Sequence, residues 1–244
     1  MGVINRRNAN QMIVDYILEQ ILSGNLKKGD KLMTEAEFSE RLGVSRIPLR
    51  EALCALGTVG ILESRQGQGT YVTAKSDPSV LGRMLYAYVV LNNIDLRQIL
   101  DVRIMIEPEA ARQAAMQSSQ RQKEEIWALS EEYRQAAESF SGVEDENKHM
   151  IELDRQIHQS VAKASCNDFL CMLFAVADTS FTELNNKNYI IADDHGAKDR
   201  SLFAKQHSDL AQAILDGNGQ AAFKAMAQHL QSLKKAHLES MNYD

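Results

Sequence analysis

The sequence predicts a mainly α-helical protein with an N-terminal winged helix-turn-helix domain and a C-terminal all-α bundle of about seven helices. Two observations predict the first domain: a turn at Gly43 between two short helical segments, and a glycine-rich hairpin pattern shortly after them. A third predicts the bundle, because apolar residues in the rest of the chain recur with a helical period and no segment alternates like a strand. We expect the first domain over residues 1–75, a linker over 76–79 and the bundle over 80–244.

The first two helices follow from their apolar periods and their caps. Residues 11–23 carry apolar side chains at a helical spacing, and Gly24 follows as a C-terminal cap. Thr34 stands three residues before Glu37, which is the capping-box pattern that starts a helix. We therefore expect a second helix from Thr34 to about residue 42.

A third helix and a hairpin complete the first domain. The helix is expected over residues 45–58, with the Ser45 hydroxyl as its N-terminal cap and Pro48 near its start, where a missing N–H costs little. Residues 61–65 and 70–73 have strand propensity and are separated by a glycine-rich turn. Three helices followed by a hairpin describe a winged helix.

The third helix carries the candidate nucleic-acid contacts. Arg46 and Arg50 are four residues apart and project from one face, as the cations of a DNA-recognition helix do. The tip of the hairpin, with Gln66, Gly67 and Gln68, can approach DNA closely because glycine lets the backbone come near a ligand. The alternatives are a solvated surface charge at Arg50 and a plain hairpin turn at Gly67 and Gly69.

The second domain is predicted to be helical almost throughout. Helices are expected at about 79–91, 95–116, 119–139, 145–164, 167–182, 199–216 and 219–239. Asp95, Ser119 and Asn167 are the expected N-terminal caps of three of them. Pro108 should kink or split the second. The polar residues 183–198 are expected to form a loop.

Four side chains of the second domain form a candidate metal site. Asp154 and His158 are four residues apart and share a helix face, and His207 and His229 lie on the last two helices. Antiparallel neighbours in a bundle can bring such residues together, and imidazoles with one carboxylate suit a divalent transition metal. The alternative is that each histidine is an ordinary hydrogen-bonded or exposed residue.

Arg103 has two interpretations. Its guanidinium could form a fork for a carboxylate ligand. It could equally form a surface salt bridge with Glu107, four residues further on, which would contribute only about 0–1 kcal/mol.

Charge and composition narrow the class of protein. The 244 residues carry a formal net charge of −6, with +2 on the first 75 residues and −8 on the rest. This asymmetry indicates a nucleic-acid module joined to an acidic module. No segment reaches the roughly 20 apolar residues of a membrane span, no signal peptide is evident, and the three cysteines have no metal-like spacing. We therefore expect a cytoplasmic protein without a membrane partner.

Ordered motifs over about the first 75 residues resemble a known family. They are Leu22-Ser-Gly24, Gly29-Asp-Lys-Leu32, Thr34-Glu35, Leu42-Gly-Val-Ser-Arg46, Pro48-Leu-Arg-Glu-Ala-Leu53, Gly60 and Gly67-Gln-Gly-Thr-Tyr-Val72. Together they resemble the winged-helix domain of GntR-family transcription regulators. The resemblance implies DNA contacts by Ser45, Arg46 and Arg50, supported by the wing residues Gln66, Gly67 and Gln68. Where the family often has an arginine in the second helix this chain has Ala36, and Arg65 is the candidate to replace part of that contact.

Looser motifs over most of residues 80–240 resemble the FCD ligand-binding domain of the FadR subfamily. They are Asp101-Val-Arg103, Glu107-Pro-Glu-Ala-Ala111, Asp154 with His158, Asn167, Arg200, His207 with Ala213-Ile214, and His229-Leu230. The resemblance implies that Asp154, His158, His207 and His229 bind a divalent metal and that Arg103 faces the same cavity. The family often has an aromatic residue where this chain has Ile157, which alters packing more than ligation.

These observations predict a metabolite-responsive, DNA-binding transcription regulator that is not an enzyme. We expect a homodimeric repressor that binds a pseudo-palindromic operator in double-stranded DNA. A small organic acid, bound at the metal and Arg103, would release it. The expected metal is Zn, Ni or Mn. Two alternatives are a metal-dependent, hydrolase-like enzyme and a DNA-binding protein that needs no effector.

Overall fold

The computed structural model describes residues 6–75, 77–188 and 197–240. The chain divides into two compact units, Met1–Leu81 and Gly82–Asp244, and each is described by itself. A helix already begins at Pro78, inside the expected linker, so the domain limits drawn from the sequence stay a prediction.

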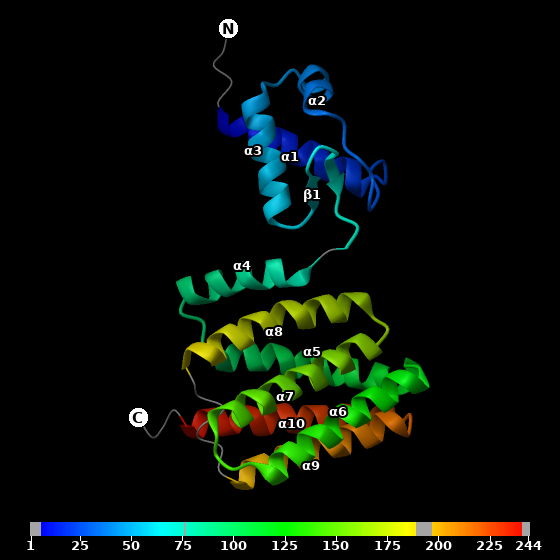
Figure 1. Cartoon of the computed structure of the whole chain (residues 1–244), viewed down its shortest axis with the longest axis vertical. Coiled ribbons are helices and arrows are strands. Elements are labelled where there is room, and N and C mark those ends of the chain that lie inside the picture. Colours follow the sequence, from blue (N-terminus) through cyan, green and yellow to red (C-terminus); the bar gives the residue numbers. More distant parts are fainter. Residues whose placement is uncertain (1–5, 76, 189–196, 241–244) are drawn as a thin grey trace. The chain divides into compact units, whose positions relative to one another are not determined.

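The described part of the first unit has three helices followed by an antiparallel hairpin. Its elements are α1 (Arg6–Leu22), α2 (Glu35–Leu42), α3 (Arg46–Thr58), β1 (Leu62–Arg65) and β2 (Gly69–Val72) (Figure 1). The predicted winged helix-turn-helix is confirmed. Its core is a single apolar cluster that includes Ile13 and Ile17 of α1, Phe38 of α2 and Leu49 of α3. Burial of these side chains holds the three helices together.

The turn between α2 and α3 follows the predicted caps with one correction. Thr34 and Glu37 form the capping box, with the Glu37 N–H donating to the Thr34 hydroxyl at 3.3 Å. Gly43 ends α2 with a φ of +64°, a conformation that glycine adopts without steric cost. Ser45 occupies the N-cap position of α3, but its hydroxyl makes no capping hydrogen bond. The reason is local, because Pro48 fills the third helical position and has no N–H to donate.

The wing is a short, regular hairpin. β1 and β2 pair in a register that places Leu62 opposite Val72 and Arg65 opposite Gly69. The two apolar partners at the base are buried and belong to the core of the unit. At the tip, the Gln68 N–H donates to the Arg65 carbonyl at 2.9 Å. The turn residues are therefore presented to solvent by a hairpin whose other end is anchored.

The described part of the second unit is an all-α bundle of seven helices, as predicted. They are α4 (Pro78–Leu91), α5 (Leu96–Gln117), α6 (Gln120–Ser139), α7 (Glu144–Ala164), α8 (Asp168–Asn188), α9 (Ala197–Leu215) and α10 (Gly219–Ser240). Figure 1 shows the long helices side by side, with α10 against α5 and α9, and α6 against α7 and α9.

The predicted caps start their helices. Asp95 accepts the Arg97 N–H at 2.8 Å, Ser119 forms a capping box with Gln122, and Asn167 accepts the Leu170 N–H at 3.1 Å. Each bond satisfies a backbone donor of the first turn that has no partner inside the helix.

One expectation for the second unit is wrong, and one of the two alternatives for Pro108 is excluded. Pro108 does not split its helix, because α5 runs from Leu96 to Gln117. The proline is buried beside a run of buried alanines, and that packing outweighs the missing backbone hydrogen bond. Residues 183–198 are also not one loop, since α8 continues to Asn188 and α9 begins at Ala197; residues 189–196 lie outside the described part.

The bundle core joins all the long helices that surround the candidate site. Leu100, Ile126, Ile157, Leu210 and Ile214 are fully buried in one apolar cluster. They come from α5, α6, α7 and α9, so the faces predicted by helical period do meet. Among the described helices, none combines the length and apolar character needed to cross a bilayer.

Candidate metal centre and nucleic-acid interface

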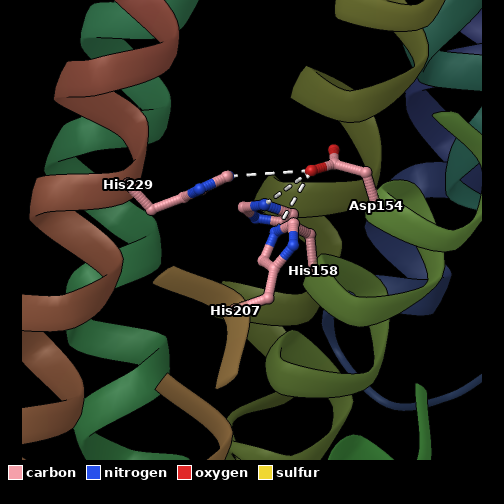
Figure 2. A group of neighbouring side chains, drawn as sticks. All are labelled: Asp154, His158, His207 and His229. Atoms are coloured by element: carbon pink, nitrogen blue, oxygen red, sulfur yellow. Dashed lines mark ion pairs between the residues drawn. The ribbon is translucent and has the colours of Figure 1, made fainter. Parts of the chain in front are cut away.

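Four polar side chains from three helices converge inside the bundle. Asp154 and His158 stand one turn apart on α7, His207 lies on α9 and His229 on α10 (Figure 2). The helical repeat explains the first pair, and the packing of α9 on α10 explains why the other two are neighbours. All four residues predicted from the sequence are therefore brought together.

The spacing of these groups fits one metal ion. The Asp154 Oδ1 atom lies 3.2 Å from the Nε2 atom of His207, 3.6 Å from that of His229 and 3.8 Å from that of His158. One potential ligand atom from each residue lies within 4.8 Å of all the others. Because zinc–nitrogen bonds are about 2.0–2.1 Å long, ligand atoms around one ion are at most about 4 Å apart, so only small adjustments are needed.

Five of the six imidazole nitrogens of this cluster make no hydrogen bond in the described part of the chain, and the sixth, Nδ1 of His158, contacts Glu107. Within the described residues, Nε2 of His158 and both ring nitrogens of His207 and His229 are buried and make no hydrogen bond. All three rings are at most 1% exposed. Buried polar atoms are normally satisfied, and several orphaned lone pairs aimed at one point match the donor set of a bound metal.

The electrostatics favour the deprotonated forms that bind metal. Burial lowers the pKa of His207, and it lowers the pKa of His229 well below its ordinary value. Burial alone would raise the pKa of the Asp154 carboxyl, but the surrounding imidazoles hold it far below its usual range. Metal ligands must be neutral imidazoles and ionised carboxylates, and the directions of these three pKa shifts favour those forms at Asp154, His207 and His229.

Arg103 lies in the same region, where it forms a buried ion pair with Glu107. Its Nε contacts the Glu107 carboxylate, and its Nη2 lies 3.5 Å from Oε2 of the same group. The side chains of Arg103 and Glu107 are 1% and 3% exposed, so the surface salt bridge considered from the sequence is wrong in its location. The same carboxylate also contacts Nδ1 of His158, which links Arg103 to the metal-site residues.

Aromatic rings and one further carboxyl enclose the cluster. The Tyr133 ring meets His207 edge-on with centroids 4.6 Å apart, and Phe203 meets His229 at 5.6 Å. Asp178, whose pKa is raised by burial, contributes negative charge near Arg103. Asp154, with a side chain 23% exposed, is the member of the cluster that solvent reaches.

The candidate DNA-binding residues of α3 are exposed together. Ser45, Arg46 and Arg50 are all exposed at the start of the helix. Arg50 is not isolated, because its Nε donates to Glu35 of α2 at 2.8 Å. The Arg50 side chain remains 66% exposed in this pair, so its guanidinium can still reach a ligand.

The wing presents its predicted residues differently. Gln66, Gly67 and Gln68 are exposed at the hairpin turn. Arg65 donates through Nε to Glu63 at 2.9 Å, and its guanidinium lies 4.2 Å from the centre of the Tyr71 ring. These contacts hold Arg65 against the hairpin itself.

The sequence reasoning missed three functional candidates: Glu107, Glu35 and Tyr133. Glu107 appeared as a possible partner of Arg103 and within a motif of the FCD resemblance, but no spacing rule connects it to His158, 51 residues away. Glu35 is 15 residues from Arg50, and Tyr133 lies on a different helix from His207. Glu35 also left a signal, as an acidic residue in the first turn of a helix beside the recognition helix.

Two known families match the chain. Residues 9–72 match the family described as "Bacterial regulatory proteins, gntR family". Residues 98–232, more than half of the chain, match the family described as "FCD domain". The chain belongs to the GntR family of bacterial regulators and carries an FCD domain. It is accordingly a DNA-binding transcription regulator, and its FCD domain holds a group of one aspartate and three histidines suited to a metal.

Known regulators are similar to this chain over nearly its whole length and nearly the whole of their own. The HTH-type transcriptional regulator YieP of Escherichia coli, itself uncharacterized, is 28% identical over 94% of this chain and 96% of its own. The Glc operon transcriptional activator of Escherichia coli is 28% identical over 94% and 89%. The structure named Streptococcus agalactiae GntR has a TM-score of 0.65 and 28% identity, covering 93% of this chain and 99% of that one. These relatives are regulators, which opposes the hydrolase alternative.

Proposed function

We propose that this regulator senses a small organic acid at a divalent metal in its FCD domain and that ligand binding changes its affinity for an operator. The observation that carries the proposal is the set of buried imidazole nitrogens that lack hydrogen-bond partners beside the Asp154 carboxylate. As a repressor, the protein would leave its operator when the acid binds.

Asp154, His158, His207 and His229 would hold the metal. A five- or six-coordinate ion held by three imidazoles and one carboxylate would keep positions open for water or for a ligand carboxylate, and zinc would have to expand beyond four ligands to do so. Zn, Ni and Mn all suit such a mixed nitrogen and oxygen set. The bound ion would supply a local positive charge inside a domain of negative net charge, which is what an anionic ligand needs.

Arg103 is the second positive group for the effector. Its contacts with Glu107 use Nε and Nη2, so Nη1 is the nitrogen with which it would meet a ligand carboxylate. The ligand would approach from the side of Asp154, the partly exposed member of the cluster. A carboxylate that touches both the metal and Arg103 would be recognised by two cations at once.

The operator would be read by the first unit. Ser45, Arg46 and Arg50 at the start of α3 are suited to the major groove, and Gln66 to Gln68 of the wing, with Arg65 beside them, to the adjacent backbone. Because its proposed partner is DNA, the protein would act in the cytoplasm.

We also propose a homodimer, because one recognition helix reads a short site and two related by two-fold symmetry read a pseudo-palindrome. In the second unit, α4, α5 and α8 enclose an apolar groove of about 370 Å³ lined by residues such as Leu85 and Val102. Nearby on α4, Tyr88 and Leu91 are 66% and 77% exposed. Such a surface supports contact with a second copy of the chain. Light scattering at micromolar concentration tests this, and a monomer with and without operator DNA would oppose it.

A binding screen tests the effector. Sugar acids, hydroxy acids and short dicarboxylates are added to the metal-loaded protein and to chelated protein, and thermal shift and retardation of DNA from around its own gene are measured. We expect a hit that needs both the metal and Arg103, with a coupling to DNA binding of about 1–3 kcal/mol. A tight ligand that is uncharged, or that still binds chelated Arg103→Ala protein, would refute the mechanism. An acid that tightens DNA binding would refute the repressor role alone.

A further inference from the structure

We propose that Glu107 is a positioning residue that orients His158 for the metal, and that Arg103 acts on the metal site through Glu107. The inference deepens the proposed metal site and rests on it. The inference concerns the chain of contacts Arg103–Glu107–His158, in which Glu107 meets the Nδ1 atom of His158 and leaves Nε2 for the metal.

The first step is the geometry of the chain. Glu107 on α5 places its two carboxylate oxygens on two different partners. Oε1 contacts Nε of Arg103, and Oε2 contacts Nδ1 of His158 on α7 while lying 3.5 Å from Nη2 of Arg103. All three side chains are at most 3% exposed. Water is therefore a poor substitute for any of these contacts.

The second step is the tautomer of His158. An ionised carboxylate only accepts hydrogen bonds, so the ring nitrogen that faces it must carry the proton. Nδ1–H of His158 donates to Glu107, and the lone pair is left on Nε2. That atom is buried, makes no hydrogen bond among the described residues, and lies 3.8 Å from Oδ1 of Asp154. The carboxylate thus directs the ligating nitrogen of His158 toward the cluster.

The third step is the role of Arg103. A buried carboxylate needs a partner, and Arg103 donates to Glu107 while its guanidinium lies 4.4 Å from the centre of the Phe181 ring. The arginine is therefore held by a ring on one side and fixes the carboxylate on the other. A change at Arg103 should reach the metal even when no effector is present, which a purely effector-binding arginine would not do.

The other two histidines provide the contrast. Both ring nitrogens of His207 and of His229 make no hydrogen bond within the described part of the chain. Their tautomers are not set by an acceptor behind the ring. His158 is the ligand whose orientation the protein specifies in advance.

The decisive variant is Glu107→Gln, in which one amide oxygen must serve two donors. Arg103, a buried cation, should keep this oxygen as its acceptor. A buried charge without a partner costs more free energy than a buried neutral donor without one. The amide NH₂ would then face Nδ1 of His158 and move the ring proton to Nε2, the ligating atom. We expect Zn²⁺ affinity, measured by chelator competition, to fall about ten- to a hundredfold.

The matched control is Glu109→Gln on the same helix. Glu109 also pairs with an arginine, Arg112, at 2.6 Å, but it contacts no member of the cluster. Its Zn²⁺ affinity should stay within about twofold of wild type. Equal losses in the two variants would mean that any change of charge on α5 disturbs the site, and the proposal would be wrong.

A double variant guards against a fold defect. In Arg103→Met with Glu107→Gln the competing donor is gone, so the amide oxygen can accept from Nδ1–H of His158 again. Zn²⁺ affinity should recover relative to Glu107→Gln alone, although both variants lack the carboxylate. A further loss, or no recovery, would overturn the positioning role.

Nitrogen NMR of the histidine rings separates this inference from the proposed function. In metal-free wild-type protein the His158 proton should reside on Nδ1, and in Glu107→Gln on Nε2. If wild-type protein shows this tautomer but binds no Zn²⁺, the proposed metal site fails while the positioning contact stands. If it binds Zn²⁺ and Glu107→Gln binds equally well, only the present inference fails.

Discussion

The polar residues of the FCD domain and those of the winged helix are held in opposite ways. His158, His207 and His229 are at most 1% exposed, and their positions are fixed by the packing of three helices. Arg50 of the recognition helix is 66% exposed and is restrained by one carboxylate, Glu35. Burial gives the metal site a geometry before its ligand arrives, whereas the exposed arginine retains the freedom to follow a groove. The contrast predicts large effects from changes in the interior and small ones at the surface.

The largest effect should follow from removing two interior ligands. His207→Ala with His229→Ala leaves one carboxylate and one imidazole, so Zn²⁺ affinity should fall by more than about a hundredfold, beyond the usual effect of residues behind the ligands. Elemental analysis and chelator competition measure it. His149→Ala is the control, because that histidine is on α7 but exposed. Full metal content in the double variant would rule out these ligands.

The second-largest effect should be that of the metal on the stability of the bundle. An ion that binds only the folded protein raises its free energy of unfolding, by about 2.7 kcal/mol at a hundred times the dissociation constant. Urea unfolding with and without chelator, followed by the fluorescence of Trp127, measures this. That residue is the single tryptophan and packs against the bundle core, so it reports on this unit. Identical unfolding curves would show that the cluster is not a metal site under these conditions.

Single changes on the recognition helix should come third. Arg46→Ala and Arg50→Ala each remove a candidate base contact, which we expect to cost about 1–3 kcal/mol in specific DNA binding. Gel retardation on fragments near its own gene is the measurement, and Arg121→Ala, an exposed arginine of the bundle, is the control. If both folded variants retard DNA like wild type, α3 is not the reading helix.

The smallest effect should come from the ion pair that restrains Arg50. Glu35→Gln removes a carboxylate beside the expected phosphates, so DNA of any sequence should bind more tightly, but by less than about 1 kcal/mol, as for other exposed pairs. Preference for the operator over random DNA should fall or stay constant. Glu40→Gln, exposed on the same helix, is the comparison. Weaker binding of Glu35→Gln alone would mean that the pair positions Arg50 for its contact.

Much of the fold could be predicted because it depends on local rules. The capping box at Thr34, the left-handed turn at Gly43 and the cap at Asp95 are set by residues a few positions apart. The same rules failed at Ser45, where Pro48 removed the donor, and at Pro108 packing kept α5 whole, which excludes the split that the proline could have caused. In both cases a second constraint outweighed the local preference.

The candidate site likewise has features set by local sequence rules and features set by tertiary packing. By itself, the sequence determined that Asp154 and His158 share a helix face, because a spacing of four residues is close to one helical turn. For His207 and His229, bundle packing offered the grouping as one of two alternatives, and a resemblance then favoured it. Tertiary structure alone decided that Arg103 is buried and that Glu107 joins it to His158, a residue 51 positions away. The physical reason is that hydrogen bonds between helices depend on how those helices pack, and no period along one helix encodes that packing.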